Sequence, residues 1–305
     1  MKRRSFLKSA GGASAAIALL QARGATEAAA LESSGFTPCV NQATTEQADF
    51  RNALDAYSKA GFRAVELWLD SVNRFLQKES VAVARRLMAD HGIVPVSSCC
   101  EGDLFFPRVP EREKRLDAFK RKLDLSAQLG APRFVMYSAV FENVTQADYD
   151  AAIPGLHHVG EFGREFQITV GIEFIRGAKF LGCLETTSRL LRKVRHPNLG
   201  VLLDTFHFYA GTSKLEDIEN LNPGEISFVH IDDVPAIPRE LLEDGHRVFV
   251  GEGVIPLEKI LGALARVYRG PVSFEVFQYA AQDPYPVAAK GFEGLSRLLA
   301  KLAKA

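Results

Sequence analysis

Short apolar segments alternate with longer amphipathic ones along the chain, and this alternation constrains the fold more than any other feature of the sequence. The short segments are rich in β-branched residues and have the length of buried strands. We expect strands at residues 35–41, 64–69, 94–100, 133–138, 169–175, 200–206, 227–232 and 272–277.

Helical periodicity occupies the intervals between these strands. We expect helices at residues 46–60, 80–91, 111–129, 147–166, 183–194, 214–221, 257–268 and 287–304. Thr44 and Thr45 are suited to capping the first helix, and Gly92 and Gly130 are typical stops for the second and third.

Eight strand–helix alternations predict a parallel sheet with helical crossovers, and eight parallel strands can close into a barrel. No Gly-rich dinucleotide-binding loop follows the first strand, and the chain has no P-loop motif. No linker or change of composition interrupts residues 35–305. We therefore predict an α/β fold with one domain at residues 31–305, a single (β/α)8 TIM barrel.

Residues 1–30 have the three parts of an export signal. Lys2, Arg3 and Arg4 form a basic start, residues 9–20 are a short apolar stretch, and residues 28–30 are small alanines. This stretch is too short to span a membrane, so no stable membrane insertion is expected. The paired arginines ahead of residues 5–8 (Ser-Phe-Leu-Lys) resemble a twin-arginine (Tat) signal, which implies export of the folded protein by the Tat machinery to the periplasm. The alternatives are an ordinary Sec signal and a disordered basic tail.

Charge makes nucleic acid an unsuitable partner for the predicted barrel. The chain has 37 basic and 37 acidic residues, and residues 1–30 contain five of the former and one of the latter. The remainder therefore has 32 basic and 36 acidic residues and a formal net charge of −4. Nucleic-acid binding needs clustered Lys and Arg, which this part of the chain lacks. Its cysteines, at positions 39, 99, 100 and 183, have no metal-binding spacing.

Ionisable residues stand at the ends of the last four predicted strands, which are the positions where a barrel places its active site. They are Glu173, Asp204, His230 and Glu275, each within an otherwise apolar run. Burying several carboxylates is costly unless they share a counter-charge, and a divalent metal supplies one. Two Glu, one Asp and one His suit a single Mn²⁺, Co²⁺, Mg²⁺ or Zn²⁺ ion.

Each of these residues also has a purely structural interpretation. Glu173 could pair with Arg176 or Lys179, Asp204 could cap a loop, His230 could be a hydrogen-bonded core histidine and Glu275 could face solvent. Their occurrence together at equivalent strand ends favours the metal site. Further candidates at early strand ends are Trp68, Tyr137 and Phe105 for stacking on a sugar ring, and Glu66 and Glu101 for binding hydroxyls.

Several motifs resemble the xylose isomerase-like barrel superfamily, often called sugar phosphate isomerase/epimerase. Residues 201–208 (VLLDTFHF) are similar to an L-x-D-S/T-F-H-F segment of its inosose (2-keto-myo-inositol) isomerase-like branch. Residues 230–233 (HIDD), 244–248 (DGHRV) and 251–253 (GEG) resemble further motifs of that branch. The specific resemblance covers residues 169–278, and the barrel pattern covers the whole predicted domain.

The resemblance implies that Glu173, Asp204, His230 and Glu275 bind the metal and that Glu173 and Glu275 also transfer a proton as catalytic residues. His207 and Arg247 then contact substrate oxygens. Two features depart from the family pattern. Gln278 stands where an Arg is expected, and residues 176–179 are unfamiliar. Related barrels often form dimers or tetramers, so a homo-oligomer is compatible with the resemblance.

Such a site predicts a metal-dependent isomerase or epimerase that acts on a small sugar or cyclitol through an enediolate, with the long loop at residues 234–256 closing as a lid. The alternative is a lyase on the same scaffold, either an inosose dehydratase or a 3-keto-sugar eliminase. A repair endonuclease would need more His ligands at strand ends. A non-catalytic sugar-binding protein would not need two acid/base carboxylates.

Overall fold

Each of the eight apolar segments forms a β-strand in the computed structural model, which describes residues 33–303. The strands pair in parallel and in sequence order, and β1 also pairs with β8, which closes the barrel. Their bounds are β1 Phe36–Asn41, β2 Ala64–Trp68, β3 Val94–Gly102, β4 Arg133–Ser138, β5 Thr169–Phe174, β6 Leu199–Asp204, β7 Ile226–Ile231 and β8 Gly270–Phe274. The predicted (β/α)8 TIM barrel is confirmed.

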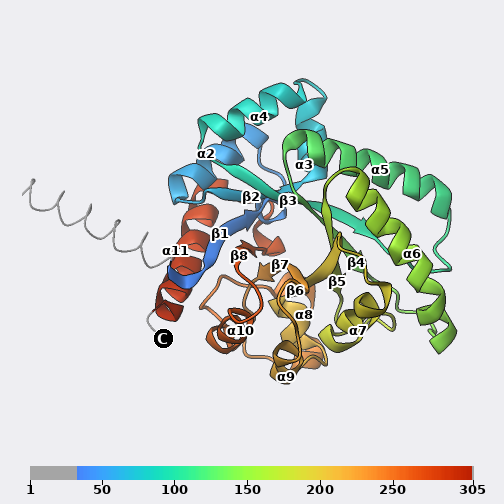
Figure 1. The fold of residues 1–305 in the computed structure, drawn as a ribbon. Helices are drawn as coiled ribbons and strands as arrows, with labels where there is room; N and C mark the ends of the chain where they lie inside the picture. Colours follow the sequence, from blue (N-terminus) through green and yellow to red (C-terminus); the bar gives the residue numbers. More distant parts are fainter. Residues whose placement is uncertain (1–32, 304–305) are drawn as a thin grey trace, which may run out of the picture.

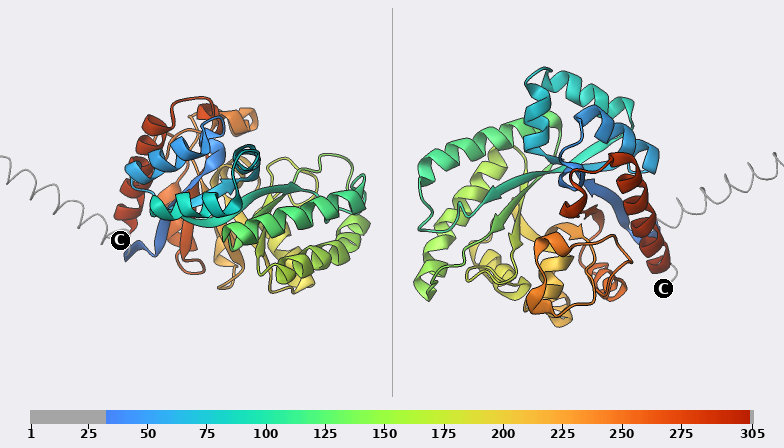
Figure 2. Two further views of the ribbon diagram at one scale, coloured as in Figure 1. Left: turned by 90° about the horizontal axis from the view of Figure 1, so that it is seen from above. Right: turned by 180° about the vertical axis from the view of Figure 1, so that it is seen from behind.

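Helices surround the strands as an outer layer (Figures 1 and 2). The main helices of the crossovers are α2 Phe50–Ala60, α4 Val81–Asp90, α5 Arg112–Leu129, α6 Gln146–Glu165, α7 Leu184–Val194, α9 Leu215–Glu219 and α10 Leu257–Leu264, and α11 Pro284–Leu302 follows β8. The last helix, α11, packs against α2, so the two ends of the described chain meet. No helix among residues 33–303 is long and apolar enough to cross a membrane.

Short elements at the barrel mouth were not expected from periodicity. They are α3 Leu69–Leu76, α8 Thr205–Ala210, η1 Gln42–Thr45, η2 Arg239–Leu241, η3 Asp244–His246 and η4 Phe277–Tyr279. The predicted cap of the first helix was wrong. Thr44 and Thr45 lie within η1, and Asp49 caps α2 by accepting the backbone N–H groups of Arg51 and Asn52. Of these short elements, α3, α8 and η1 follow a strand end directly, whereas η2 and η3 lie in the loop after β7 and η4 lies shortly after β8.

Candidate metal centre at the barrel mouth

The four predicted metal ligands come together at the C-terminal ends of β5 to β8. Glu173 lies in β5, Asp204 ends β6, His230 lies in β7 and Glu275 follows β8 directly. The parallel register aligns Asp204 with His230, and His230 with the residue two positions before Glu275. All four side chains are buried, so the strands bring three carboxylates and an imidazole into a small volume away from solvent.

His230 lies at the centre of this group. Its Nδ1 is 3.5 Å from Glu173 Oε1, 3.8 Å from Asp204 Oδ2 and 3.3 Å from Glu275 Oε2. One ligand atom from each of the four residues lies within 4.8 Å of all the others. Metal bonds of about 2.0–2.2 Å hold neighbouring donor atoms about 3–3.5 Å apart, so the set is slightly wider than a filled site. His230 Nδ1 has no hydrogen-bond partner among the described residues, as expected of a metal-binding nitrogen. The residues present therefore fit a divalent metal.

The other nitrogen of His230 is held by Glu66 in β2. His230 Nε2 lies 3.1 Å from Glu66 Oε1 and 3.0 Å from Oε2, and Ser273 Oγ donates to Oε2 at 2.7 Å. Glu66 is fully buried inside the barrel. A carboxylate behind a ligand histidine fixes the ring and its tautomer. Glu66 thus contacts His230 in the barrel interior, a different role from the hydroxyl binding considered above.

Arg247 supplies the only fully buried guanidinium at the described mouth, and it contacts three carboxylates. Its Nη1 lies 2.7 Å from Asp204 Oδ2, 2.9 Å from Asp232 Oδ2 and 2.7 Å from Glu275 Oε2. Asp232 in turn accepts a hydrogen bond from Thr205 Oγ1 at 2.8 Å. Five buried carboxylates, those of Glu66, Glu173, Asp204, Asp232 and Glu275, therefore face one Arg and one His, an excess of negative charge that favours a bound cation.

His207 lies beside Arg247 because of the short helix α8. Asp204 is the N-cap of this helix and accepts the His207 backbone N–H at 2.9 Å through Oδ1. Its other oxygen, Oδ2, faces Arg247 and His230. The His207 Nε2 is then 3.3 Å from Arg247 Nη2. Asp204 thus caps α8 and also belongs to the set of predicted metal ligands. With His207 and Arg247 in place, all six predicted site residues lie together.

The surroundings of the two glutamates set their pKa values apart. Burial raises the pKa of Glu173 to about 7. Burial opposes ionisation of Glu275 too, but the charges of His230 and Arg247 outweigh it and lower the pKa of Glu275 to about 2. Burial and Arg247 lower the pKa of His207 to about 3. Burial alone would lower the pKa of His230, but Glu275, Glu66 and Glu173 raise it well above its usual value. Carboxylates with such different pKa values are typical of an acid/base pair.

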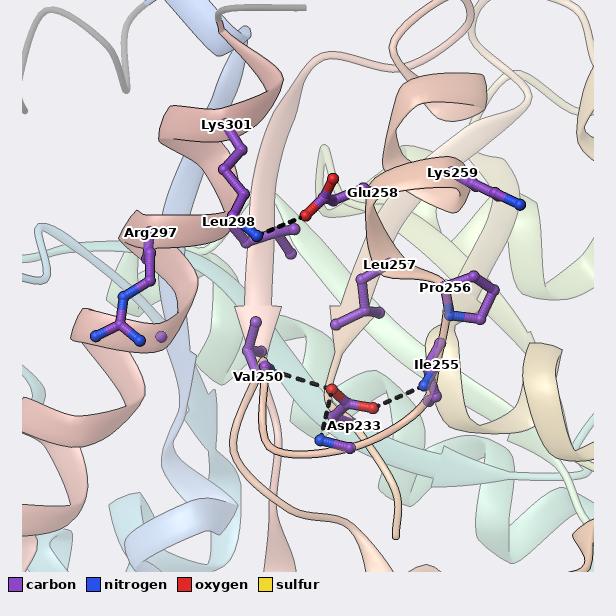
Figure 3. A pocket seen from close by; sticks show the side chains of 13 residues that line it. Asp233, Val250, Ile255, Pro256, Leu257, Glu258, Lys259, Arg297, Leu298 and Lys301 are labelled. Carbon is purple, nitrogen blue, oxygen red and sulfur yellow. Dashed lines mark hydrogen bonds and ion pairs between the residues drawn. The ribbon is translucent and has the colours of Figure 1, made fainter. Parts of the chain in front are cut away.

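The loop between β7 and α10 carries Arg247 and is anchored by Asp233. The Asp233 carboxylate accepts four backbone N–H groups at 2.9–3.1 Å, those of Val234, Gly251, Gly253 and Ile255. Figure 3 shows this carboxylate turned toward the loop backbone, beside a cavity of about 460 Å³ that α10 and α11 also line. A backbone bridge joins Asp233 to Val248. Arg247 therefore already lies in the site in this structure, and closure of its loop as a lid stays a prediction.

Two glycines explain the GEG motif in this loop. Gly251 has a φ of +87°, which L side chains rarely adopt, and a Cβ at Gly253 would lie 2.2 Å from Val234 O and 2.3 Å from Asp233 Oδ1. Gln278 also holds the loop, because its Nε2 donates to Arg247 O at 2.5 Å. The residue that stands in place of the expected Arg thus supports the backbone of Arg247.

A second group of possible ligands lies on the outer wall of the barrel. His157, Glu161 and His196 also lie within metal-binding distance of one another. The His196 Nδ1 accepts the Asn198 backbone N–H at 3.1 Å, so the proton of a neutral ring is on Nε2, 2.9 Å from Glu161 Oε1. A metal at Nε2 would need the opposite tautomer. This group is therefore a hydrogen-bonded pair beside an exposed histidine.

Other candidates lie away from the metal centre. Phe105 is almost fully buried and belongs to the core between the barrel and its helices. Glu101 pairs with Arg115 at 2.7 Å and with Lys122 at 2.9 Å. The polar residues that sequence reasoning missed are Asn41, whose Nδ2 donates to Glu275 Oε1 at 2.6 Å, and Asp232. Asp232 lies within the HIDD motif, and this motif is the sequence feature that could have identified it as a site residue.

Comparison with known proteins gives the family of the chain. The model of a family described as xylose isomerase-like TIM barrel matches residues 54–298. An inosose isomerase of Bacillus subtilis (strain 168) is 25% identical over 248 residues, which are 79% of this chain and 88% of that protein. A ketose 3-epimerase of Arthrobacter globiformis is 26% identical over 247 residues, with 77% and 80% covered.

A 3-dehydroshikimate dehydratase of Pseudomonas putida is 28% identical over 249 residues. The match includes 81% of this chain but only 39% of the dehydratase, so this chain corresponds to less than half of that protein. Among solved structures, the IOLI protein with a bound zinc atom superposes with a TM-score of 0.79 at 23% identity, covering 87% of this chain and 98% of that one. This likeness concerns the fold.

Proposed function

This chain belongs to the xylose isomerase-like TIM barrel family, and from that premise we propose that it is a divalent-metal-dependent isomerase or epimerase of a small sugar or cyclitol. The observation that carries the proposal is the buried set of Glu173, Asp204, His230 and Glu275 around an unpartnered imidazole nitrogen. Inosose isomerases and a ketose 3-epimerase among the relatives support the reaction class.

Mn²⁺, Co²⁺, Mg²⁺ and Zn²⁺ all suit this mixed oxygen and nitrogen donor set. When bound, such an ion would stabilise negative charge on a carbonyl oxygen and a neighbouring hydroxyl oxygen of the substrate. A zinc atom in a protein of the same fold is compatible with this choice of metals. The four side chains named above would hold the ion.

The protein's own residues would then move the proton. Glu173 and Glu275 act as the acid/base pair, one removing the proton next to the carbonyl and the other returning it. Return to the adjacent carbon gives an isomer, and return to the opposite face of the same carbon gives an epimer. His207 and Arg247 orient the substrate oxygens. The depressed pKa of His207 keeps its ring neutral, so that it can donate one N–H without adding charge.

Replacing Glu173 or Glu275 with Gln tests these roles. We expect kcat, measured with a substrate that the wild type converts, to fall about 10²–10⁴-fold in each variant, because a positioned acid or base contributes that much. Metal content, measured by elemental mass spectrometry, separates a lost proton transfer from a lost ligand. Glu185→Gln, at an exposed position of α7, is the matched control and should keep full activity. Near-native turnover in both site variants would contradict the assignment.

A metal-dependent lyase is the second candidate. The 28% sequence identity to a 3-dehydroshikimate dehydratase favours it. The same carboxylates would remove a proton next to the carbonyl, and a β-hydroxyl would leave as water. Product analysis by mass spectrometry distinguishes the two, because only the lyase gives a product lighter by one water molecule.

We also propose that residues 1–30 direct Tat export of the folded protein to the periplasm. This segment lies outside the described residues, so the proposal rests on Arg3 and Arg4 ahead of the apolar stretch. An extracytoplasmic location favours unphosphorylated sugars or cyclitols, since phosphorylated intermediates are normally cytosolic.

A further inference from the structure

Two buried N–H donors without partners lie at the ends of adjacent strands β1 and β2. Gln42 follows β1 directly, and Trp68 is the last residue of β2. The Gln42 Nε2 and Trp68 Nε1 atoms have no hydrogen-bond partner within the part of the chain that the structure describes. Gln42 is 1% exposed, so solvent does not reach its amide freely.

The orientation of both side chains follows from their neighbours. Gln42 Oε1 accepts the Trp68 backbone N–H at 3.2 Å, which assigns the amide and turns Nε2 away from that bond. Trp68 is two residues after Glu66, so the two side chains share a face of β2. Glu66 faces His230 inside the barrel, and Trp68 packs on the interior cluster that contains Cys99. Trp68 therefore lies on the mouth side of the barrel interior.

An unsatisfied buried donor costs about 1–3 kcal/mol, so two of them at the ends of adjacent strands favour a bound acceptor. The neighbouring amide of Asn41 already donates to Glu275 and is not available. Glu275 on the neighbouring strand end and Glu66 below are both carboxylates, which would repel an anionic group placed here. An uncharged hydroxyl or carbonyl oxygen fits the two donors and their surroundings.

We propose that Gln42 and Trp68 form an oxygen-binding subsite that selects uncharged polyhydroxy ketones, ketoses or keto-cyclitols, over carboxylated or phosphorylated ones. The proposal rests on the proposed function, because it assigns the substrate class of the same site. β1 and β5 are four strands apart in the closed barrel, so the subsite lies across the mouth from Glu173. It binds an oxygen remote from that carboxylate.

Trp68 is the only tryptophan in the chain, so its fluorescence reports directly on this position. The metal-loaded protein is titrated with D-fructose, with 2-keto-myo-inositol and with the anionic 3-dehydroshikimate while the Trp68 emission is recorded. We expect at least one of the two neutral compounds to change the emission saturably, and 3-dehydroshikimate to bind at least about tenfold more weakly. Tighter binding of the anion, or no saturable binding of either neutral compound, would overturn the proposal.

Two conservative variants test the donors themselves by calorimetry. Trp68→Phe keeps an aromatic ring but removes Nε1–H, and Gln42→Glu keeps the acceptor for the Trp68 backbone N–H but removes Nε2–H. We expect each variant to raise the Kd of the neutral ligand about tenfold, a typical effect of one lost hydrogen bond. Gln47→Leu, exposed in the same segment, is the matched control and should leave Kd unchanged.

The two proposals fail in different ways. Unchanged Kd values in both variants, with normal turnover, would remove the subsite and leave the isomerase or epimerase standing. Weaker binding in both variants without any turnover by the wild type would support the subsite and contradict the proposed reaction.

Discussion

Arg247 contacts three carboxylates, and two of them, Asp204 and Glu275, belong to the predicted metal ligands. Its charge therefore lowers the cost of holding these carboxylates ionised before any metal binds. The contact with substrate oxygens that the family resemblance implies remains a prediction. Its Nη1 contacts the carboxylates, and its Nη2 lies within hydrogen-bond distance of both His207 and Asp244.

Glu66 contacts the metal ligand His230 and is not itself among the predicted ligands, yet its removal should weaken metal binding. Glu66→Leu leaves His230 without the carboxylate that orients its ring, and loss of such a partner typically costs 10–100-fold in metal affinity. Competition with a chelator measures the change in Kd. Ser273→Ala removes only the weaker support of Glu66 and should change Kd much less. An unchanged Kd in Glu66→Leu would show that His230 is held by packing alone.

Metal affinity should depend steeply on pH near neutrality. Glu173, with a pKa raised to about 7 in the metal-free site, holds a proton below that pH, and only its carboxylate binds a metal. Affinity should therefore fall at least about tenfold for each pH unit below 7, and because His230, with its raised pKa, must also lose a proton to bind the metal, affinity should continue to rise above pH 7. Titration calorimetry in buffers of different ionisation enthalpy measures the released protons. A Kd constant from pH 6 to 8 would exclude this coupling.

That these six candidate residues lie together at the mouth could be predicted from strand ends and motifs, but most of their partners could not. His230 and Glu66 are 164 positions apart, and Asn41 and Glu275 are 234 apart. Nothing local marks such pairs, because only the closing of the barrel brings them together. The contacts that Asn41, Glu66 and Gln278 make with the site residues are therefore seen only in the structure.

Among the elements of the mouth, the loop from β7 to α10 has most of its side-chain support from Asp233. Asp233→Ala removes the acceptor of four backbone N–H groups. Each unsatisfied buried group costs about 1–3 kcal/mol, and the loop can relax, so we expect a loss of about 2–4 kcal/mol in the free energy of unfolding. Urea denaturation measures this loss.

The control is Glu252, an exposed charged residue of the same loop. Glu252→Ala removes an exposed ion pair with Lys290 and should cost less than about 1 kcal/mol. Asp233→Ala should also lower activity, because the part of the loop that follows Arg247 loses the carboxylate that holds its backbone at Gly251, Gly253 and Ile255. Equal stability of the two variants would mean that other contacts hold the loop.

Element types were predictable here because each crossover helix has a long apolar face and each strand a short apolar run. The short elements were not. Residues of α8 and η1 lie where a strand was expected to continue or a helix to begin, and their one or two turns are too short to show a period. They form because side chains such as Asp204 and Asn41 accept the first free backbone N–H groups.

At the scale of the whole molecule, the metal centre exists only after the barrel has closed. Its ligands come from β5 to β8, its supports come from β1 and β2, and closure needs β1 to pair with β8. Nearly the entire chain must therefore be synthesised and folded before the site forms. Export of an already folded molecule is compatible with such a site, whereas export of an unfolded chain would require the site to form afterwards.

Arg3 and Arg4 distinguish these two routes. A Tat signal depends on the arginine pair itself, whereas a Sec signal needs only positive charge in its basic start. The double change Arg3→Lys and Arg4→Lys keeps that charge, and we expect the precursor to accumulate in the cytoplasm as a folded, protease-resistant and metal-binding protein. Cell fractionation with immunodetection measures the distribution, and Lys8→Arg is the control that leaves the pair intact. Undiminished export of the double variant would assign residues 1–30 to the Sec route and imply that the barrel closes, and takes up its metal, outside the cytoplasm.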